Sequence, residues 1–419
     1  MHTALVLFTR DLRVHDHRGL SEAARSYERV VPLFVLDDRI LESRTANRIS
    51  FLLDALADLR ESLRECGGDL VVRRGDSVEQ TLRLARSVGA TTVYVGEDAS
   101  AYAQARERQL AHACERERIE LRIVDTCAVV APGLLAPDGS DHYRVFTPYW
   151  RRWRTVALPT VARPPAHLRL PEDIAAGELP ALRGLTTRCL SPDLMRGGER
   201  EGRRRLSRWL SSGIDRYDQE RDLLAADATS RLSPYLHFGC LSALEVAARA
   251  QGYETADPFL RQLCWRDFFL QLLAANPKTS REDFRPRRGD WRTDDESFAR
   301  WREGRTGIPI VDAGMRQLAR EGWLHNRARL IVGSFLTRTL RLDWRLGADI
   351  FFELLVDGDV ASNVGNWQWI AGTGANPRPN RALSPARQAR RFDPDGEYVR
   401  RYVPELADLP RDEIDARRS

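Results

Sequence analysis

The first 128 residues alternate short apolar runs with amphipathic stretches, and this alternation restricts the possible fold more than any other feature of the chain. The apolar runs have the length of strands and lie at 4–8, 29–36, 69–73, 91–95 and 120–124. Between them, segments such as 49–63 carry apolar residues at helical spacing. Because strands that alternate with helices form a parallel sheet covered on both faces, we predict an α/β domain over residues 1–128.

Prolines become frequent between residues 129 and 199, where they interrupt any long helix or strand. One interpretation is an ordered connector on the protein surface, and the alternative is a disordered linker. An aromatic cluster favours the ordered connector, since large rings need a surface to pack against. It comprises Tyr143, Phe146, Tyr149, Trp150 and Trp153.

From residue 200 to residue 419, glycine and proline separate stretches with helical periodicity. These stretches lie at 199–213, 242–250, 258–275, 310–321, 327–340 and 348–356. We therefore predict that an α/β N-terminal domain is joined through a long connector to an all-α domain.

Charge, cysteines and hydropathy argue against several functions. The formal net charge of +5 permits nucleic-acid binding without demonstrating it. None of the six cysteines forms a C-x-x-C pair, and the tight histidine pair in His15-Asp16-His17 is interpreted as an exposed turn, so we predict no metal site. No segment approaches about 18 consecutive apolar residues, and the N-terminus lacks the pattern of a signal peptide. We expect no membrane span and a cytoplasmic location.

Hydroxyl groups and one guanidinium are concentrated in Thr229-Ser230-Arg231-Leu232-Ser233-Pro234. Hydroxyls and backbone N–H groups at the start of a helix bind phosphate oxygens. An ordinary helix N-cap with polar neighbours is the alternative.

Three side chains share one face of the predicted helix 258–275, because Gln262, Trp265 and Arg266 are spaced i, i+3 and i+4. An indole stacks on nucleobases, a carboxamide bonds a base edge and a guanidinium binds phosphate. This face is a candidate nucleic-acid site, and half-buried packing is the alternative.

Asp357 and Asp359 flank Gly358, and Asn363 lies four residues past Asp359. Converging carboxylates suggest general acid–base chemistry, while helix capping is the alternative.

Tryptophans form the last candidate group in the C-terminal half of the chain. Each ring is open to interpretation as a core residue. Near a flavin, a row of indoles would instead carry single electrons. The three candidates are Trp291, Trp344 and Trp367.

Several motifs follow one another along nearly the whole chain, beginning with Phe8-Thr9-Arg10-Asp11-Leu12-Arg13 and ending with Phe392-Asp393-Pro394-Asp395-Gly396-Glu397-Tyr398. Between them lie the motifs at 146–150, 229–233, 265–268, 323–327 and 357–369. In this order they resemble the photolyase/cryptochrome flavoproteins, most of all the class I cyclobutane pyrimidine dimer photolyases. The resemblance implies a Rossmann-like N-terminal domain and a helical domain that binds FAD.

The resemblance also assigns the cofactor site. Asn363 would face the flavin N5 atom, and Asp359 would stay ionised beside Arg329. Trp367, Trp344 and Trp291 would carry electrons between the flavin and the surface. The residues that would hold FAD are Tyr217, Thr229, Ser230, Arg231, Leu232, Ser233, Phe259, Asn326, Arg329, Phe351, Asp357, Asp359 and Asn363.

In the repair members of this family, light-excited reduced FAD donates one electron to a pyrimidine dimer that has been flipped out of the DNA duplex. The resemblance implies catalytic roles for Gln262, Asn326 and Asn363. Damaged DNA is the expected partner, and we expect a monomer. The positions that match DNA or lesion contacts are Arg221, Trp265, Arg266, Arg327, Leu330 and Gln388.

Some positions depart from the repair pattern. Gln262 stands where dimer-repair enzymes carry Glu, so a negative charge and a transferable proton are lost. Leu330 replaces a Met, and the segment 377–385 lacks aromatic rings that would each contribute about 1–3 kcal/mol of base stacking. Asn326 stands where (6-4) photoproduct enzymes carry His, which argues against that chemistry.

Two functions therefore stay open. The first is light-driven repair of cyclobutane pyrimidine dimers, and the second is a flavin photoreceptor or photoenzyme with weak or no repair. The resemblance also permits a second, antenna chromophore in the N-terminal domain. Arg44-Thr45-Ala46-Asn47-Arg48 is similar to deazaflavin-type members, which favours a deazaflavin over a folate.

Overall fold

The computed structural model describes residues 2–43, 45–286, 289–375, 382–410 and 413–414. The chain forms two compact units. Unit 1 comprises Met1–Cys189, Arg196–Ser211 and Arg231–Pro277. Unit 2 comprises Leu190–Met195, Ser212–Ser230 and Lys278–Ser419. The division differs from the expected segments 1–128, 129–199 and 200–419, because residues 196–211 and the helices between 231 and 277 belong to unit 1.

Unit 1 is built on a parallel sheet of five strands in the order β3-β2-β1-β4-β5. Every residue of the central strand β1 is buried, and its Leu5 lies opposite Val31 of β2 and Val93 of β4. Each predicted strand overlaps an observed one, so the predicted α/β architecture is confirmed. The strands are β1 (Thr3–Phe8), β2 (Arg29–Leu36), β3 (Val71–Arg74), β4 (Ala90–Gly96) and β5 (Glu120–Val124).

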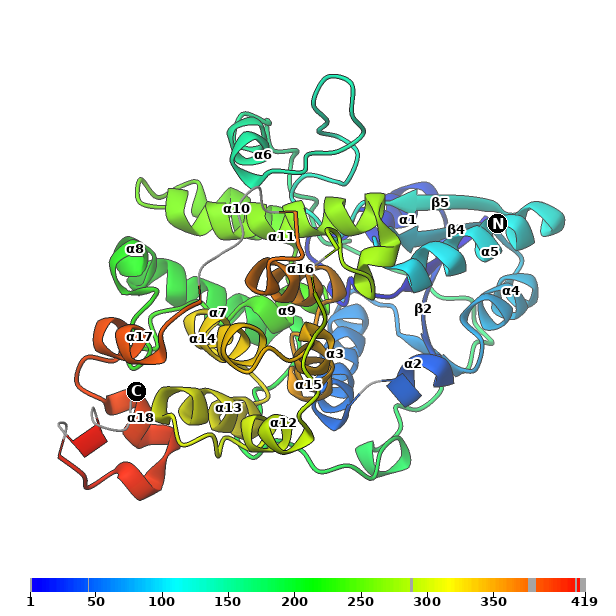
Figure 1. Ribbon diagram of the computed structural model, residues 1–419. Coiled ribbons are helices and arrows are strands. Elements are labelled where there is room, and N and C mark those ends of the chain that lie inside the picture. Colours follow the sequence, from blue (N-terminus) through cyan, green and yellow to red (C-terminus); the bar gives the residue numbers. More distant parts are fainter. Residues whose placement is uncertain (1, 44, 287–288, 376–381, 411–412, 415–419) are drawn as a thin grey trace. The chain divides into compact units, whose positions relative to one another are not determined.

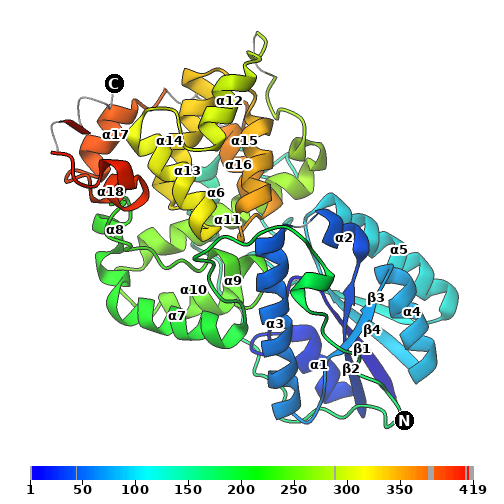
Figure 2. The same ribbon diagram turned by 90° about the horizontal axis from the view of Figure 1, so that it is seen from below.

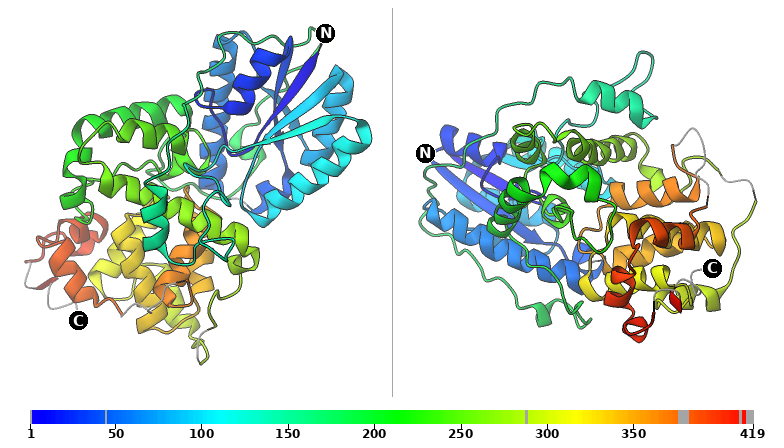
Figure 3. Two further views of the ribbon diagram at one scale, coloured as in Figure 1. Left: turned by 90° about the horizontal axis from the view of Figure 1, so that it is seen from above. Right: turned by 90° about the vertical axis from the view of Figure 1, so that its left-hand side faces the viewer.

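Helices cover both faces of this sheet. Those that follow the strands are α1 (Arg18–Ser26), α2 (Asp38–Ser43), α3 (Ala46–Glu65), α4 (Ser77–Val88) and α5 (Ala101–Glu117). Figure 2 shows α1 and α3 on one side of the strands and α4 and α5 on the other, and the strands fan out side by side in the left view of Figure 3. The remaining helices of unit 1 are α6 (Phe146–Trp153), α7 (Glu199–Ser212), α9 (Ser233–His237), α10 (Ala243–Ala250) and α11 (Asp257–Ala275), with a short 3₁₀ turn at Leu182–Gly184.

The aromatic residues of the connector pack as predicted. Phe146, Tyr149, Trp150 and Trp153 of α6 are buried, and α6 lies along α11 (Figure 1). In contrast, the prediction of an exposed turn at His15-Asp16-His17 was wrong. His17 is 1% exposed, because its ring caps α1 and lies 3.1 Å from the Asp11 carboxylate.

Unit 2 is helical, as predicted. Its α-helices are α8 (Tyr217–Glu220), α12 (Asp295–Arg302), α13 (Pro309–Glu321), α14 (Asn326–Ser334), α15 (Trp344–Leu354), α16 (Val360–Ala371), α17 (Pro385–Phe392) and α18 (Glu397–Tyr402). A π-helical turn, Phe335–Thr339, continues α14, and 3₁₀ turns occur at Ile214–Arg216, Pro277–Ser280 and Pro404–Leu406. Trp301, Trp344, Trp367 and Tyr398 are the largest side chains in its core.

Neither a membrane span nor a metal site is visible in the part of the chain that the structure describes. No helix there has the length and hydropathy needed to cross a membrane, and no three His, Cys, Asp or Glu side chains gather as metal ligands.

Candidate functional site

An ion pair between a half-buried guanidinium and a buried carboxylate connects helix α14 to the turn after α15. Nη2 of Arg329 donates to both carboxylate oxygens of Asp357, at 3.0 and 2.7 Å, and Nε donates to the Leu324 carbonyl at 2.9 Å. The Asp357 side chain is only 2% exposed. Removing one partner from a buried pair leaves an uncompensated charge, so this pair holds the turn 355–359 in place.

Helix α16 begins at the acidic turn that the sequence singled out. Asp359 is its N-cap, and Oδ1 accepts from the Ser362 N–H at 2.8 Å, which confirms the capping interpretation. One turn later, buried Asn363 donates through Nδ2 to the Ala348 carbonyl at 3.2 Å. The expected pairing of Asp359 with Arg329 was wrong, because the guanidinium bonds Asp357 while Asp359 caps the helix.

The hydroxyl-rich segment before α9 forms a strained turn. Asp227 and Arg231 have φ values of 48° and 50°, in the left-handed region that non-glycine residues rarely occupy. The Thr229 hydroxyl oxygen is buried and has no hydrogen-bond partner among the described residues. A buried hydroxyl without a partner is costly, so a polar group of a bound molecule would stabilise this turn. Leu232 is buried and Ser233 is exposed at the first position of α9.

The inner end of the tryptophan row is tightly enclosed. Trp367 of α16 is 2% exposed, and the Phe351 ring meets it edge to face with centroids 4.9 Å apart. Gly347 of α15 lies so close that a Cβ placed there would be 2.2 Å from the Trp367 ring. Only glycine allows this approach, so helix α15 is brought directly against the indole.

The other two tryptophans lie in neighbouring segments of unit 2. Trp344 lies one helical turn before Gly347, on the same face of α15, and its Nε1 donates to Asp283 at 2.8 Å. The Arg292 N–H donates to the Arg341 carbonyl at 2.9 Å, which places the residue after Trp291 beside the turn before Trp344. Trp344 is 1% exposed, whereas Trp291 is half-buried against the same core.

Helix α11 carries the candidate nucleic-acid face of unit 1. Gln262 and Trp265 are both half-buried, so each side chain retains an accessible part. Arg266 donates to the carbonyls of Cys127 and Leu236, and its side chain is 13% exposed, which makes it a structural link as well as a candidate contact. At the first turn, the Phe259 ring packs on Trp209 with centroids 4.3 Å apart.

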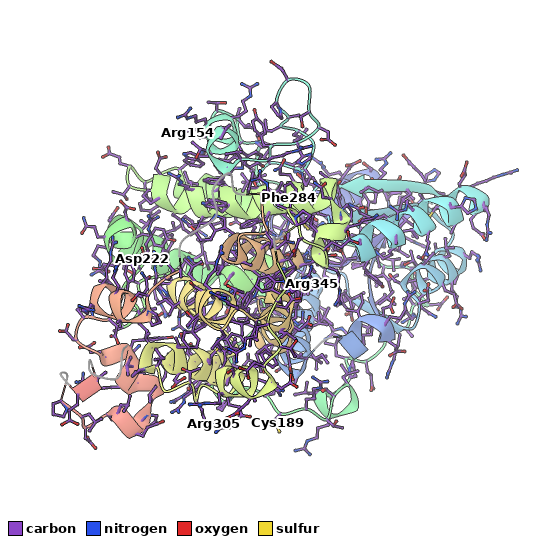
Figure 4. All side chains as sticks on the ribbon, in the orientation of Figure 1. Arg154, Cys189, Asp222, Phe284, Arg305 and Arg345 are labelled. Carbon is purple, nitrogen blue, oxygen red and sulfur yellow. The ribbon has the colours of Figure 1, made fainter. Side chains whose placement is uncertain are left out.

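On α14, the candidate lesion contacts share one face. Asn326 is exposed and Leu330, four residues later, is half-buried. Between them, Arg327 forms a two-nitrogen ion pair with Asp222, labelled in Figure 4, at 3.2 and 2.7 Å. The Arg327 guanidinium also lies 4.2 Å from the Phe392 ring centroid.

Two further candidates, Gln388 of α17 and Arg221 after α8, lie elsewhere in unit 2. The Oε1 atom of Gln388 is buried without a hydrogen-bond partner among the described residues, which suits a role in holding a bound group. The guanidinium of Arg221 lies 5.8 Å from the ring of Tyr217, and burial raises the pKa of that phenol to about 12.

Sequence reasoning missed Asp267 and Gln271, both buried on α11. Asp267 accepts from the N–H groups of Val129 and Val130 and from Trp153 Nε1, and burial raises its pKa to about 6 against the lowering effects of Arg266 and these donors. A signal was present, because Asp267 and Gln271 are spaced i and i+4 among the apolar residues of the second half of the helix.

Known protein families and relatives match this chain along most of its length. The chain matches the family model of DNA photolyase over residues 4–168, and that of the FAD binding domain of DNA photolyase over residues 259–419. It is 47% identical over 415 residues to the deoxyribodipyrimidine photo-lyase of Streptomyces griseus, with 98% of this chain and 91% of the relative covered. The chain belongs to the photolyase/cryptochrome family.

Other photolyase/cryptochrome proteins are similar along the whole chain. A class III photolyase structure from Agrobacterium tumefaciens has a TM-score of 0.92 and 33% identity, covering 99% of this chain and 89% of that one. An archaeal photolyase from Sulfolobus tokodaii with two FAD molecules has a TM-score of 0.88 and 32% identity, covering 99% and 93%. Cryptochrome DASH of Natronomonas pharaonis is 37% identical over 437 residues, covering 98% and 92%.

FAD is the cofactor that this photolyase/cryptochrome domain binds. The residues present fit it, because the buried Thr229 hydroxyl lacks a partner among the described residues and a flavin dinucleotide carries phosphate and ribose oxygens that would supply one.

Proposed function

We propose that this chain is a deoxyribodipyrimidine photo-lyase that repairs cyclobutane pyrimidine dimers in DNA under light. The supporting observation is 47% identity to a deoxyribodipyrimidine photo-lyase over nearly the whole chain, together with the three candidate tryptophans of unit 2, of which Trp367 and Trp344 are buried and Trp291 is half-buried. We propose that these indoles pass single electrons to the bound cofactor. We further propose that the protein acts as a cytoplasmic monomer.

The proposed FAD-binding residues are those that the resemblance to photolyases assigns. Thr229 and its neighbours would bond the phosphates and ribose, and Phe351 would exclude water beside Trp367. The amide of Asn363 is held by the Ala348 carbonyl, so its orientation is fixed before a cofactor binds. The complete proposed set is Tyr217, Thr229, Ser230, Arg231, Leu232, Ser233, Phe259, Asn326, Arg329, Phe351, Asp357, Asp359 and Asn363.

When bound, reduced and excited by blue or near-ultraviolet light, FAD supplies one electron to the dimer and recovers it after the ring opens. Two carbon–carbon bonds break and no net oxidation or reduction occurs. The protein's part is to bind the flipped dimer, and flipping costs least at a damaged and poorly paired site. Gln262 and Asn326 are the proposed lesion-bonding side chains, with proposed DNA and lesion contacts at Arg221, Trp265, Arg266, Arg327, Leu330 and Gln388.

Repair of dimer-containing DNA tests this function. The reduced protein, illuminated with an oligonucleotide that contains thymine dimers, is expected to restore normal thymine absorbance. The same mixture kept in the dark is the control. Recovery no greater than in the dark would reject the proposal.

A photoreceptor or a photoenzyme for another ligand is the second candidate. It is supported by Gln262 in place of the Glu of repair enzymes, by the altered segment 377–385, and by relatives named cryptochrome DASH at 36% and 37% identity. Residues 377–381 lie outside the described part of the chain. If Gln262 limits repair, Gln262→Glu raises the yield of repaired thymine per absorbed photon, whereas an unchanged yield would assign the limit elsewhere.

An antenna chromophore in unit 1 is a further proposal, with a deazaflavin favoured over a folate. Arg44 lies outside the described residues, but burial lowers the pKa of nearby Arg48 to about 10. Buried Arg106 keeps two nitrogens, Nε and Nη2, without hydrogen-bond partners among the described residues, although Nη2 lies 3.8 Å from the Glu107 carboxylate. An anionic chromophore would supply hydrogen-bond acceptors to Arg106. The absorption spectrum of the purified protein, with and without added deazaflavin, tests this assignment.

A further inference from the structure

The Trp265 indole is covered on one face by a ring from the connector. Phe146, the first residue of α6, lies parallel to it with centroids 3.5 Å apart and an interplanar angle of 4°. Phe146 is 6% exposed, whereas Trp265 stays half-buried. At this separation the two rings are in full van der Waals contact, so no base enters between them without displacing Phe146.

A cation closes the other side of this stack. The Arg261 guanidinium carbon lies over the Phe146 ring, 5.4 Å from its centroid. Because the indole occupies one face of Phe146, the guanidinium lies over the opposite face. Arg261 and Trp265 are four residues apart on α11, so two side chains of one helix face hold Phe146 between them.

Hydrogen bonds to α11 fix α6 on both sides of Phe146. Before the helix, Gln271 accepts from the Tyr143 N–H at 3.1 Å and donates to the Tyr143 carbonyl at 2.6 Å. At the end of the helix, the Trp153 Nε1 donates to Asp267 at 2.9 Å. Withdrawal of Phe146 would therefore break bonds to buried polar groups, which is costly.

Two further rings contact the indole. Phe268 meets it edge to face at 87° and Phe269 lies tilted to it at 33°, with centroids 5.6 and 5.5 Å away. Trp265 thus has one face covered by Phe146, two more ring neighbours and a remaining part accessible. A nucleobase needs only one flat face for stacking, and that face binds best when its plane is already fixed.

We propose that Phe146 is a positioning residue for lesion recognition, which fixes the plane of Trp265 and leaves the opposite indole face for an unstacked base. The inference rests on the proposed function, since it requires Trp265 to contact the lesion. The stack should matter for affinity by about 2- to 10-fold, the range expected for one aromatic pair. Repair of a dimer that is already bound should be unaffected, because Phe146 would act only through Trp265.

The test compares FAD-loaded Phe146→Leu, Phe146→Tyr and Tyr149→Leu proteins. Tyr149→Leu is the matched control, because Tyr149 lies on the same helix and contacts Phe268, 5.6 Å away, rather than Trp265. Dissociation constants are measured for dimer-containing and undamaged oligonucleotides, together with repair at saturating DNA. Phe146→Leu is expected to weaken binding of the dimer alone by about 2- to 10-fold. Phe146→Tyr keeps the ring and should bind as the wild type does, and so should Tyr149→Leu.

A spectroscopic measurement separates positioning from general damage. In protein labelled with 5-fluorotryptophan, the resonance of Trp265 is identified by its loss in Trp265→Phe. Without DNA, it should shift in Phe146→Leu and stay in place in Tyr149→Leu. A shifted resonance with unchanged dimer affinity would overturn the inference, and so would tighter binding by Phe146→Leu, which would mean that Phe146 competes with the base. A wild-type protein without preference for dimer DNA would reject the proposed function itself, whereas wild-type preference matched by Phe146→Leu would reject this inference alone.

Discussion

The aromatic residues beside α11 and those around α16 are packed in different ways. Beside α11, one ring, Phe146, lies nearly parallel to Trp265, at 4°, although Phe268 meets the same indole at 87°. Around Trp367, the rings of Phe351 and Trp301 meet the indole edge to face, at 70° and 72°. A parallel neighbour covers one face of an indole, whereas the Trp367 indole has edge-to-face neighbours and is almost completely buried.

The difference teaches that the number of aromatic residues does not distinguish a base-binding surface from an electron relay. The angle between neighbouring rings and the burial of the indole do distinguish them, since Trp265 is half-buried and Trp367 is 2% exposed. A ring that binds a ligand must expose a face, whereas a ring that passes electrons needs only neighbouring rings.

Trp367→Phe is expected to have the largest effect. If light-driven reduction of the flavin were unchanged in this variant, Trp367 would not act as an electron relay. The substitution keeps a ring but removes the easily oxidised indole, so light-driven reduction of bound flavin should be almost completely lost. Absorbance changes during illumination measure it. Trp301→Phe is the control, because Trp301 lies 6.3 Å from Trp367 but outside the proposed row, and most of the photoreduction should remain. Equal losses in both variants would contradict the row.

Asp357→Asn tests whether the enclosed region depends on its ion pair. It leaves the Arg329 guanidinium without its carboxylate and should lower the free energy of unfolding by about 3–5 kcal/mol, with loss of bound flavin. Urea unfolding and flavin content measure both effects. Asp222→Asn removes the partner of Arg327. The Asp222 side chain is 34% exposed, against 2% for Asp357, so its loss should cost only about 0–1 kcal/mol. Similar losses of unfolding free energy in the two variants would show that burial of the carboxylate does not determine how much the ion pair stabilises the protein.

Asp267→Asn tests the polar contacts beneath the parallel rings. The pKa of Asp267 is raised from 3.8 to about 6, so the folded protein binds this proton more tightly than the unfolded chain. The resulting stability is complete below about pH 4 and is lost as the pH rises through about 6. Unfolding free energies measured between pH 4 and 7 should show a flatter slope in the variant, by up to about 3 kcal/mol. Asp257→Asn, at the exposed start of the same helix, should keep the wild-type slope, and a wild-type slope in Asp267→Asn would contradict the assignment.

Gly347→Ala should have the smallest effect and sharpens the description of the enclosed region. The added methyl group would clash with Trp367, so the free energy of unfolding should fall by about 1–3 kcal/mol and photoreduction should slow. Thermal unfolding and illumination measure the two effects. Gly252→Ala is the control, because the nearest atom to its Cβ would be 3.5 Å away. No change in Gly347→Ala would mean that the indole moves freely.

Local features of the site could be predicted where a chain segment provides its own partners. The cap of α16 lies within four residues, so capping by Asp359 could be named from the sequence as one of two interpretations, and the structure confirms it. Its pairing with Arg329 was predicted wrongly, because two carboxylates two residues apart compete for one guanidinium and only packing decides between them. The burial of His17 was missed because its partner, the Asp11 carboxylate, lies outside the His15-Asp16-His17 turn, and the turn itself gives no sign of that contact.

The sequence by itself determined the five strands, the helical C-terminal part and the tryptophans worth testing, because periodicity and side-chain chemistry are local properties. Tertiary structure alone decided which helices join unit 1, that Gly347 admits Trp367, and that Phe146 lies on Trp265. These contacts join residues far apart in the sequence. Phe146 and Trp265, for example, are 119 positions apart, and such partners are chosen by shape and burial across the fold rather than by neighbours along the chain.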